Sequence, residues 1–406
     1  MRHGFILVVM LFTTVTARPA AATTPDEVGL FIGTPVDWKV GELAGQYFYS
    51  DEQGHRWTVK LKPGDKVDGK PQSVNMTVSA DGIQPASLSI DISDSDDNGT
   101  LAVYNFDAGL PTFLTTHYTN GAHCCYDVQA VVFNGKTLVA TDVDSYDGGV
   151  DVRDIDGDGT YEIDTIDQRF LYAFDGYDWS RAAREIDKVR DRDTVAVTSD
   201  PQYQPYLMAE LDRELAECDA DPGPGMCAGP LGTAAVLGIY QSAAANVPFE
   251  KIDNNKGASY LTCSKDDCGK AIKFQNYRQA LEYRLKDWGY NTSSSLNDKG
   301  RAFLRRFAAF TKGFGAPALP CGKDAFQVRL DKNEQFAEIG TPGHICRVEK
   351  INVLENAAIA LGFCSMTTSS SLLIAMELDG DELSMSMIDK GVLDAKSAPG
   401  TIKACR

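Results

Sequence analysis

The sequence predicts an α+β protein with a β-rich N-terminal half, a helical middle and a small, disulfide-stapled β domain at the C-terminus. Three observations support this fold class: short runs alternate apolar and polar residues up to about residue 200, apolar residues then recur at helical spacing, and strand-like runs return from about residue 316. The 406 residues are 43% hydrophobic and 24% charged, which is typical of a globular chain with two or three cores. We expect a signal peptide over 1–22, a β-rich domain over 23–200, a helical domain over 201–315 and a small β domain over 316–406.

The first residues are typical of an export signal. A short basic start, MRHG, precedes the apolar run FILVVMLFTTVTA, which is too short to span a bilayer. Cleavage is expected after Ala17 or Ala22. No later run is apolar enough to span, so we expect a periplasmic or secreted protein without a membrane span.

Strands are predicted up to about residue 200. Runs such as RWTVKLK and SVNMTVS alternate apolar and polar residues, which is the pattern of a strand with one buried face. Asn134-Gly135 and Asp175-Gly176 are turn signals between such runs. We expect this half to be arranged as partial, propeller-like repeats, because it also contains a repeated acidic segment.

Helices are predicted in the middle of the chain. Segment 206–218 aligns Leu207, Leu211 and Leu215 on one face. Two further segments carry aromatic stripes: Phe274, Tyr277, Leu281, Leu285 and Trp288, ending at Gly289, and then Phe303, Phe307, Phe310 and Phe314. Beyond them, segment 372–387 predicts a hairpin around Asp379-Gly380, with Ile374, Met376 and Leu378 facing one way.

The chain has ten cysteines, and in an exported protein an even number favours disulfides. Closeness in sequence favours Cys218 with Cys227 and Cys263 with Cys268, which leaves a C-terminal group to staple the last domain: Cys321, Cys346, Cys364 and Cys405. The neighbours Cys124 and Cys125 are expected to form a vicinal disulfide or two separate ones. A catalytic pair with His123 is disfavoured, because neighbours along a strand point to opposite faces.

The acidic balance of the chain limits its partners. The formal net charge is −18, whereas nucleic acids and anionic membranes require dense basic surface. We therefore expect no nucleic acid and an unknown protein or glycan as partner, with cations and basic proteins favoured by charge.

An acidic segment occurs twice, sixty residues apart. The run VDVRDIDGDGTYEI, residues 150–163, aligns without a gap with IDISDSDDNGTLAV, residues 90–103. Apolar residues flank both at matching places, which indicates an internal repeat of strand, acidic loop and strand.

The spacing of these acids suits calcium. Calcium takes six to eight oxygen ligands, and carboxylates at alternate positions of a tight loop point inward, with glycine permitting the turn. The predicted ligands of the second loop are Asp154, Asp156, Asp158, the Thr160 carbonyl and Glu162. An EF-hand is rejected, because Thr165 stands where its twelfth-position Glu would be and the flanks are strand-like.

The segment over about residues 85–180 resembles the calcium loops of FG-GAP or VCBS-type repeats, as in integrin-like propeller blades. The resemblance implies Ca²⁺ ligands at Asp154, Asp156, Asp158, Thr160 and Glu162. It also implies a weaker site at Asp94, Asp96 and Asn98, where Ala102 replaces the last carboxylate. The usual role of the ion in such blades is to hold a loop in place. Two repeats are too few to close a propeller. An alternative is a pair of solvated acidic turns without an ion, because turns also favour Asp, Asn and Gly.

The sequence favours a calcium-stabilised binding protein over an enzyme. No HExxH, GxSxG, Walker or GxGxxG pattern is present, so hydrolases and nucleotide-binding enzymes lack local support. Two alternatives remain: a secreted or periplasmic hydrolase whose acids are scattered through the fold, and a periplasmic lysozyme inhibitor. The latter rests on the run AELDRELAEC, which is similar to a cysteine-bearing helix of such inhibitors, and on the attraction between an acidic protein and basic lysozyme.

Overall fold

A computed structural model gives the fold. It describes residues 27–43, 45–68, 70–92, 97–107, 109–121, 124–256, 260–264, 267–293, 296–308, 314–315, 325–341, 344–354, 357–365, 370–379, 382–389, 392–393 and 401–404. The predicted signal peptide lies outside these residues.

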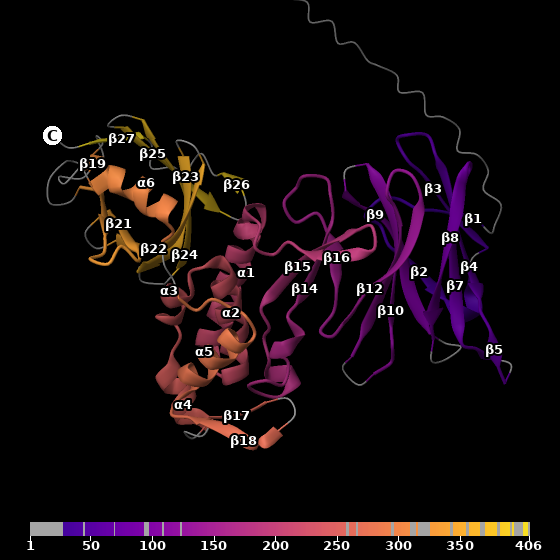
Figure 1. Cartoon of the computed structure of the whole chain (residues 1–406), viewed down its shortest axis with the longest axis horizontal. Helices are drawn as coiled ribbons and strands as arrows, with labels where there is room; N and C mark the ends of the chain where they lie inside the picture. Colours follow the sequence, from indigo (N-terminus) through magenta and orange to yellow (C-terminus); the bar gives the residue numbers. More distant parts are fainter. Residues whose placement is uncertain are drawn as a thin grey trace, which may run out of the picture.

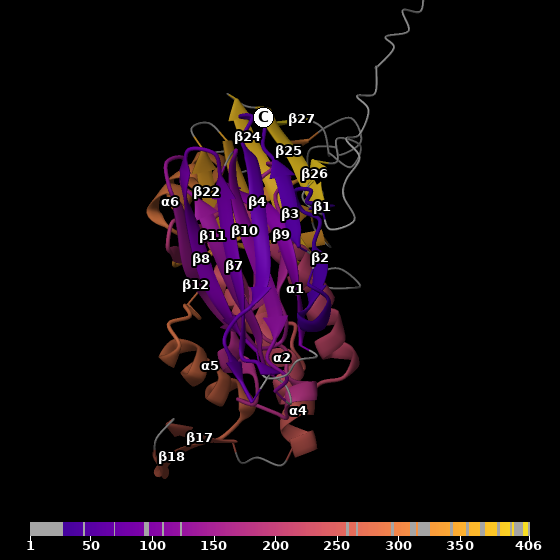
Figure 2. The same ribbon diagram turned by 90° about the vertical axis from the view of Figure 1, so that its right-hand side faces the viewer.

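The N-terminal half is a sandwich of two five-stranded sheets (Figures 1 and 2). The first sheet has the order β1 (Glu27–Gly29), β3 (Gln46–Ser50), β4 (Arg56–Pro63), β7 (Ser73–Ala80) and β8 (Ile83–Asp91). The second has the order β12 (Leu138–Tyr146), β11 (Tyr126–Phe133), β10 (Leu110–Tyr118), β9 (Asn98–Asp107) and β2 (Val36–Lys39). Trp57 and Met76 of the first sheet share a buried core with Phe113 and Val131 of the second. The alternation of apolar and polar residues along these strands therefore corresponds to one buried face on each sheet.

Two five-stranded sheets and a separate four-stranded sheet stand where the sequence predicted partial propeller-like repeats, and the described strands form no closed propeller. The first acidic segment connects β8 and β9, which lie in different sheets, whereas the second connects two strands that pair with each other. The two segments are alike in sequence and different in pairing. A period-two pattern fixes which face of a strand is buried and does not fix its neighbour.

A smaller sheet follows the sandwich, with the order β13 (Asp151–Arg153), β14 (Glu162–Ile166), β15 (Arg184–Arg190) and β16 (Asp193–Ala196). Ile163 and Val189 pack against the outer face of the second sandwich sheet, around Tyr104 and Val128. Ile186 belongs instead to the core shared with the helices. The small sheet thus lies between the sandwich and the helices, as Figure 1 shows.

The helical region holds α1 (Gln204–Ala220), α2 (Pro224–Leu237), α3 (Tyr240–Ala244), α4 (Phe249–Lys256) and α5 (Tyr277–Asp287), with a hairpin of β17 (Tyr260–Ser264) and β18 (Asp267–Phe274). The predictions of α1 and α5 are confirmed, except that Phe274 ends a strand. The almost fully buried α2 was not predicted, because its glycines and Pro230 read as helix breakers. Its glycines have a packing role: a Cβ at Gly225 or Gly229 would collide with the backbone of residues 179–182.

The C-terminal region is one antiparallel sheet with α6 (Asp298–Ala308) packed on it. Its strands are β19 (Phe314–Gly315), β20 (Gln327–Leu330), β21 (Ala337–Thr341), β22 (His344–Leu354), β23 (Ala357–Ser365), β24 (Ser370–Asp379), β25 (Glu382–Asp389), β26 (Val392–Leu393) and β27 (Thr401–Ala404). The predicted hairpin is confirmed, since β24 pairs with β25 up to Asp379 opposite Glu382. Phe303 and Phe307 are buried in the core, while Phe314 lies in a strand and Phe310 is outside the described residues.

Disulfides join three cysteine pairs in the described part of the chain. Cys218–Cys227 links the end of α1 to α2, Cys346–Cys364 joins opposite residues of β22 and β23, and Cys124–Cys125 is a vicinal pair. Of the remaining predicted partners, Cys321 and Cys405 lie outside the described residues. The side chains of Cys263 and Cys268 lie outside the described part as well, although β17 and β18 pair with each other.

We predict that the mature, denatured but unreduced protein shows essentially no free thiol in a titration. Two or more free thiols would contradict the expected oxidation of all ten cysteines. Replacing Cys218 and Cys227 together by Ser should lower the free energy of unfolding by about 3 kcal/mol, because the bond closes a loop of about ten residues in the unfolded chain. The matched control replaces Cys124 and Cys125 by Ser. This pair closes almost no loop, so a much smaller loss is expected.

Candidate metal centre

The second acidic segment forms the connection of a tight hairpin. Strands β13 and β14 pair antiparallel, with Arg153 opposite Glu162 at the end nearest the loop. Gly157 and Gly159 have φ values of +77° and +86°, a left-handed conformation that favours glycine. The two glycines let the chain turn back within a narrow loop, so that several side chains point into it.

Three predicted ligands converge in this loop. One carboxylate oxygen from each of Asp154, Asp156 and Glu162 lies within 4.8 Å of the others. Two oxygens bound to one calcium ion at about 2.3–2.6 Å can be at most about 5.2 Å apart, so the separations between these oxygens are compatible with a shared ion. No other group of three or more such side chains in the described part of the chain is this close.

Backbone amides shape the loop around Asp154. Its Oδ1 accepts hydrogen bonds from the backbone N–H groups of Gly157 at 2.7 Å and Asp158 at 3.1 Å, and its Oδ2 accepts from Gly159 at 3.0 Å. These bonds position the first carboxylate independently of any ion. A site whose first ligand is already positioned loses less conformational freedom when an ion binds.

Asp158 does not join the converging group. Its Oδ1 accepts from the backbone N–H of Thr160 at 2.7 Å and from the Thr160 hydroxyl at 2.6 Å, and these two bonds lower the pKa of Asp158. Asp156 behaves in the opposite way, because burial, opposed by a backbone hydrogen bond, raises its pKa. A cation near Asp156 would favour the charged form of its carboxylate, which burial and the neighbouring acids disfavour.

A lysine already compensates Glu162. Glu162 is completely buried, and its Oε1 lies 2.8 Å from the Nζ of Lys188 on the neighbouring strand β15. The Tyr203 hydroxyl donates to the same oxygen at 3.1 Å, and the Ile155 N–H donates to Oε2 at 2.9 Å. Burial would lower the pKa of Lys188, but the hydrogen bond and charge of Glu162 outweigh it and raise that pKa. Burial, followed by the charge of Glu162, raises the pKa of Tyr203 to about 12.

Lys188 and Tyr203 are functional neighbours that sequence reasoning missed. Lys188 also donates to the Thr160 hydroxyl at 2.7 Å, so one ammonium group bridges the loop and the last predicted ligand. The only signal in the sequence was a lysine next to Val189 in the strand-like run EIDKVR, which an exposed lysine would share.

The first predicted site is described only in part. Asp94 and Asp96 lie outside the described residues, and Asn98 is exposed at the start of β9, where it pairs with Lys39 of β2. The neighbouring acid Asp97 is buried and accepts a hydrogen bond from Asn120 at 2.6 Å. Asn98 thus stands in a strand that pairs across the sheet, in contrast to Asp158 in its loop.

A network of charges ties the hairpin to α1. Asp164, on β14, pairs with Arg153 and accepts a hydrogen bond from Tyr206 of α1 at 2.7 Å. Arg184, on β15, lies 2.7 Å from Glu210 of the same helix. The loop, the small sheet and α1 therefore form one electrostatically linked unit.

The vicinal disulfide bears on the hypothesis of a catalytic cysteine paired with His123. Cys124 and Cys125 are bonded to each other, so neither is a thiol. His123 lies outside the described residues. A nucleophilic cysteine at this position is therefore excluded as long as the bond is intact.

The chain matches parts of two known proteins. No family model and no solved structure matches the chain. The chain is 27% identical over 197 residues to a protein of Synechocystis sp. named "Probable thylakoid lumen protein", covering 45% of this chain and 58% of that protein. It is 30% identical over 102 residues to an uncharacterized protein of Sinorhizobium fredii, covering 25% of this chain and 16% of that protein. The chain thus spans less than two thirds of either relative. Within the described residues, every helix is too short or too polar to cross a membrane.

We predict that Lys188→Met lowers the free energy of unfolding, measured in chelator, by roughly 3–5 kcal/mol, because it leaves the buried Glu162 carboxylate without a counter-charge. The double variant Lys188→Met with Glu162→Gln should regain most of this loss. Lys62→Met, at an exposed strand position, is the matched control and should change stability by less than about 0.5 kcal/mol. If Lys188→Met is as harmless as Lys62→Met, the ammonium group of Lys188 is not what stabilises the buried carboxylate.

Proposed function

We propose that this protein is a calcium-stabilised, extracytoplasmic binding protein, with one ion held by the loop from Asp154 to Glu162. The single observation that carries the proposal is the convergence of three carboxylates within 4.8 Å in a hairpin loop. Asp154, Asp156 and Glu162 would each supply a carboxylate oxygen. The Thr160 carbonyl, and Asp158 after its side chain turns inward, would complete the shell, as the resemblance to FG-GAP or VCBS-type loops implies.

The role proposed for the ion is structural. It would neutralise the Asp156 carboxylate, whose pKa is raised because burial outweighs the backbone hydrogen bond to this side chain. It would also fix the loop end of the β13–β14 hairpin, which is linked through Asp164 and Tyr206 to α1. The ammonium group of Lys188 already lies beside the Glu162 carboxylate. We therefore expect a modest affinity for calcium, with a Kd on the order of 10⁻⁴ to 10⁻³ M as in extracellular modules.

The extracytoplasmic location rests on two further findings. Three disulfides in the described part of the chain fit an oxidising compartment. The relative from Synechocystis sp. is named as a probable thylakoid lumen protein, which is a compartment outside the cytoplasm. A binding role is proposed in preference to an enzyme because an ion in the loop would fix its conformation, in which backbone amides and Lys188 already position Asp154 and Glu162.

We predict that millimolar calcium raises the melting temperature of the protein above its value in chelator. At a hundred times the Kd, binding should add about 2.7 kcal/mol to the free energy of unfolding. Asp156→Asn should abolish this rise because it removes one ligand. In chelator the same variant should be as stable as the original chain or more so, since the raised pKa shows that the folded state disfavours this charge.

The matched control is Asp193→Asn, which removes an exposed carboxylate from β16 and should keep the full calcium response. Calcium should also reduce the loss caused by Lys188→Met, because the ion replaces the missing positive charge near Glu162. An identical melting temperature in chelator and in calcium would remove the proposal, and a full calcium response in Asp156→Asn would place the ion elsewhere.

A further inference from the structure

Tyrosines gather at one end of the sandwich, where the connection between β10 and β11 meets the segment that links β14 to β15. Tyr118 ends β10 and Tyr126 begins β11, and the two pair opposite each other with ring centroids 5.1 Å apart. Tyr172 and Tyr177 lie in the linking segment, with ring centroids 5.5 Å apart. Tyr118 is close enough to Tyr177 to act on it electrostatically, so the two pairs adjoin. We call these four residues the tyrosine surface.

The tyrosine surface is open to solvent. Tyr126 is 41% exposed and Tyr172 is 56% exposed, while Tyr118 and Tyr177 are half-buried. Tyr172 also has a φ value of +61°, a left-handed conformation that is unfavourable for a bulky side chain. An exposed ring in such a conformation adds little to the stability of the core, and residues held in this way cluster at functional sites.

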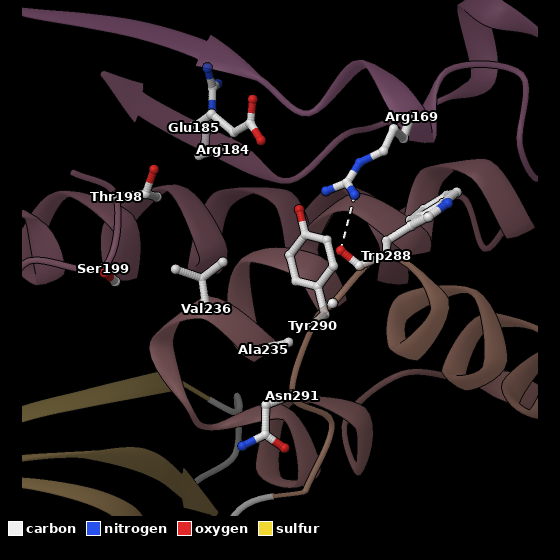
Figure 3. Close-up of a pocket in the computed structure, with 11 residues that line it drawn as sticks. Arg169, Arg184, Glu185, Thr198, Ser199, Ala235, Val236, Trp288, Tyr290 and Asn291 are labelled. Carbon is white, nitrogen blue, oxygen red and sulfur yellow. Dashed lines mark hydrogen bonds between the residues drawn. The ribbon is translucent and has the colours of Figure 1, made fainter. Parts of the chain in front are cut away.

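The linking segment is fixed to its surroundings on two sides. Toward the sandwich, the Gln168 side chain donates to a backbone carbonyl near the end of β12 at 3.0 Å, and the Tyr177 hydroxyl donates to Asp147 at 3.0 Å. Toward the helices, Arg169 donates to the Trp288 carbonyl at 3.0 Å, and Figure 3 shows this bond at the edge of a pocket between the small sheet and the helices. A surface that is already positioned loses less conformational freedom when a partner binds.

The segments that form the tyrosine surface carry negative charge. Residues 118–127, 144–149 and 170–180 contain neither lysine nor arginine, and their acids are Asp127, Asp144, Asp147, Asp175 and Asp178. The arginines that flank the linking segment pair with other acids, Arg169 with Asp167 at 2.6 Å and Arg181 with Glu217 at 3.0 Å. The tyrosine surface therefore combines exposed aromatic rings with an excess of carboxylates.

This combination favours a basic protein segment as the partner. The face of an aromatic ring attracts a cation, most often the guanidinium group of arginine, which also stacks on the ring. Carboxylates beside the rings would act as counter-charges, and tyrosine is enriched among the residues that dominate protein–protein interfaces. A neutral glycan could stack on the rings, but it would not gain from the net negative charge.

We propose that the tyrosine surface docks a basic segment of a partner protein, with arginine or lysine side chains lying on the rings of Tyr126 and Tyr172 and the surrounding aspartates as counter-charges. This inference rests on the binding role proposed above and gives that role a class of partner. The formal net charge of −18 would add a long-range attraction. The tyrosine surface shares no residue with the loop from Asp154 to Glu162, so docking does not require calcium.

The test uses a peptide of arginines, hexa-arginine, and its neutral isostere, hexa-citrulline, each titrated calorimetrically into the whole protein in chelator at physiological ionic strength. Hexa-arginine should bind with a saturable isotherm and at least tenfold more tightly than hexa-citrulline. The double variant Tyr126→Thr with Tyr172→Asn should weaken the binding of hexa-arginine about tenfold, because it removes two ring contacts. The variant keeps the net charge, so this loss would report contact with the rings and not the general attraction.

Two controls accompany this variant. Asparagine tolerates the left-handed conformation at position 172, so the double variant is expected to fold, and its thermal unfolding checks this. Tyr283→Ala removes an exposed tyrosine from α5, next to Arg284, and should keep the full affinity.

No saturable binding of hexa-arginine, equal affinity for hexa-citrulline, or unchanged affinity in the folded double variant would each overturn the proposal. Tight binding of a neutral oligosaccharide that the double variant abolishes, without binding of hexa-arginine, would assign the tyrosine surface to a glycan and would also overturn it. The titration contains no calcium, so its failure is distinct from a missing calcium response of the melting temperature.

Discussion

A buried carboxylate requires a counter-charge. Glu162 is such a carboxylate, and the elements in the middle of the molecule meet at its side chain. It has no exposed surface, and it meets Lys188 from β15, Tyr203 from the segment that leads into α1, and the backbone of the acidic loop. The loop, the small sheet and the first helix therefore share one electrostatic centre. Removing the ammonium group of Lys188 would leave the Glu162 carboxylate buried and unpaired, which would lower the free energy of unfolding.

The same requirement is met in different ways at two neighbouring sites. At Asp164 the protein supplies its own cations, from Arg153 and Arg184, and a hydroxyl from Tyr206. At the acidic loop it supplies Lys188 for Glu162 but leaves Asp156 insufficiently compensated, and we propose that calcium completes the balance. The ion pairs of Asp164 are therefore complete within the protein, whereas the acidic loop is a candidate site for an added cation.

The sequence was sufficient to predict elements that depend on local periodicity. The helix with Leu207 and Leu211, the hairpin ending at Asp379 and the bond between Cys218 and Cys227 all follow from residues close in sequence. The buried helix α2 could not be predicted, because its glycines make sense only against the backbone of residues 179–182. The sandwich also depends on residues far apart in sequence. Alternation of apolar and polar residues identifies the buried face of a strand, but it does not show that β8 and β9 belong to different sheets. In the candidate site, the acids were visible in the sequence, whereas Lys188 and Tyr203 come from later segments that only the fold brings to Glu162.

The most direct test of the proposed calcium site is the number of calcium ions bound by the purified protein at equilibrium, measured by dialysis against millimolar calcium. We expect about one ion per chain, and close to none for Asp156→Asn at the same free calcium concentration. A stoichiometry near zero for the original chain, or one that Asp156→Asn leaves unchanged, would contradict the assignment of the loop from Asp154 to Glu162 as the calcium site.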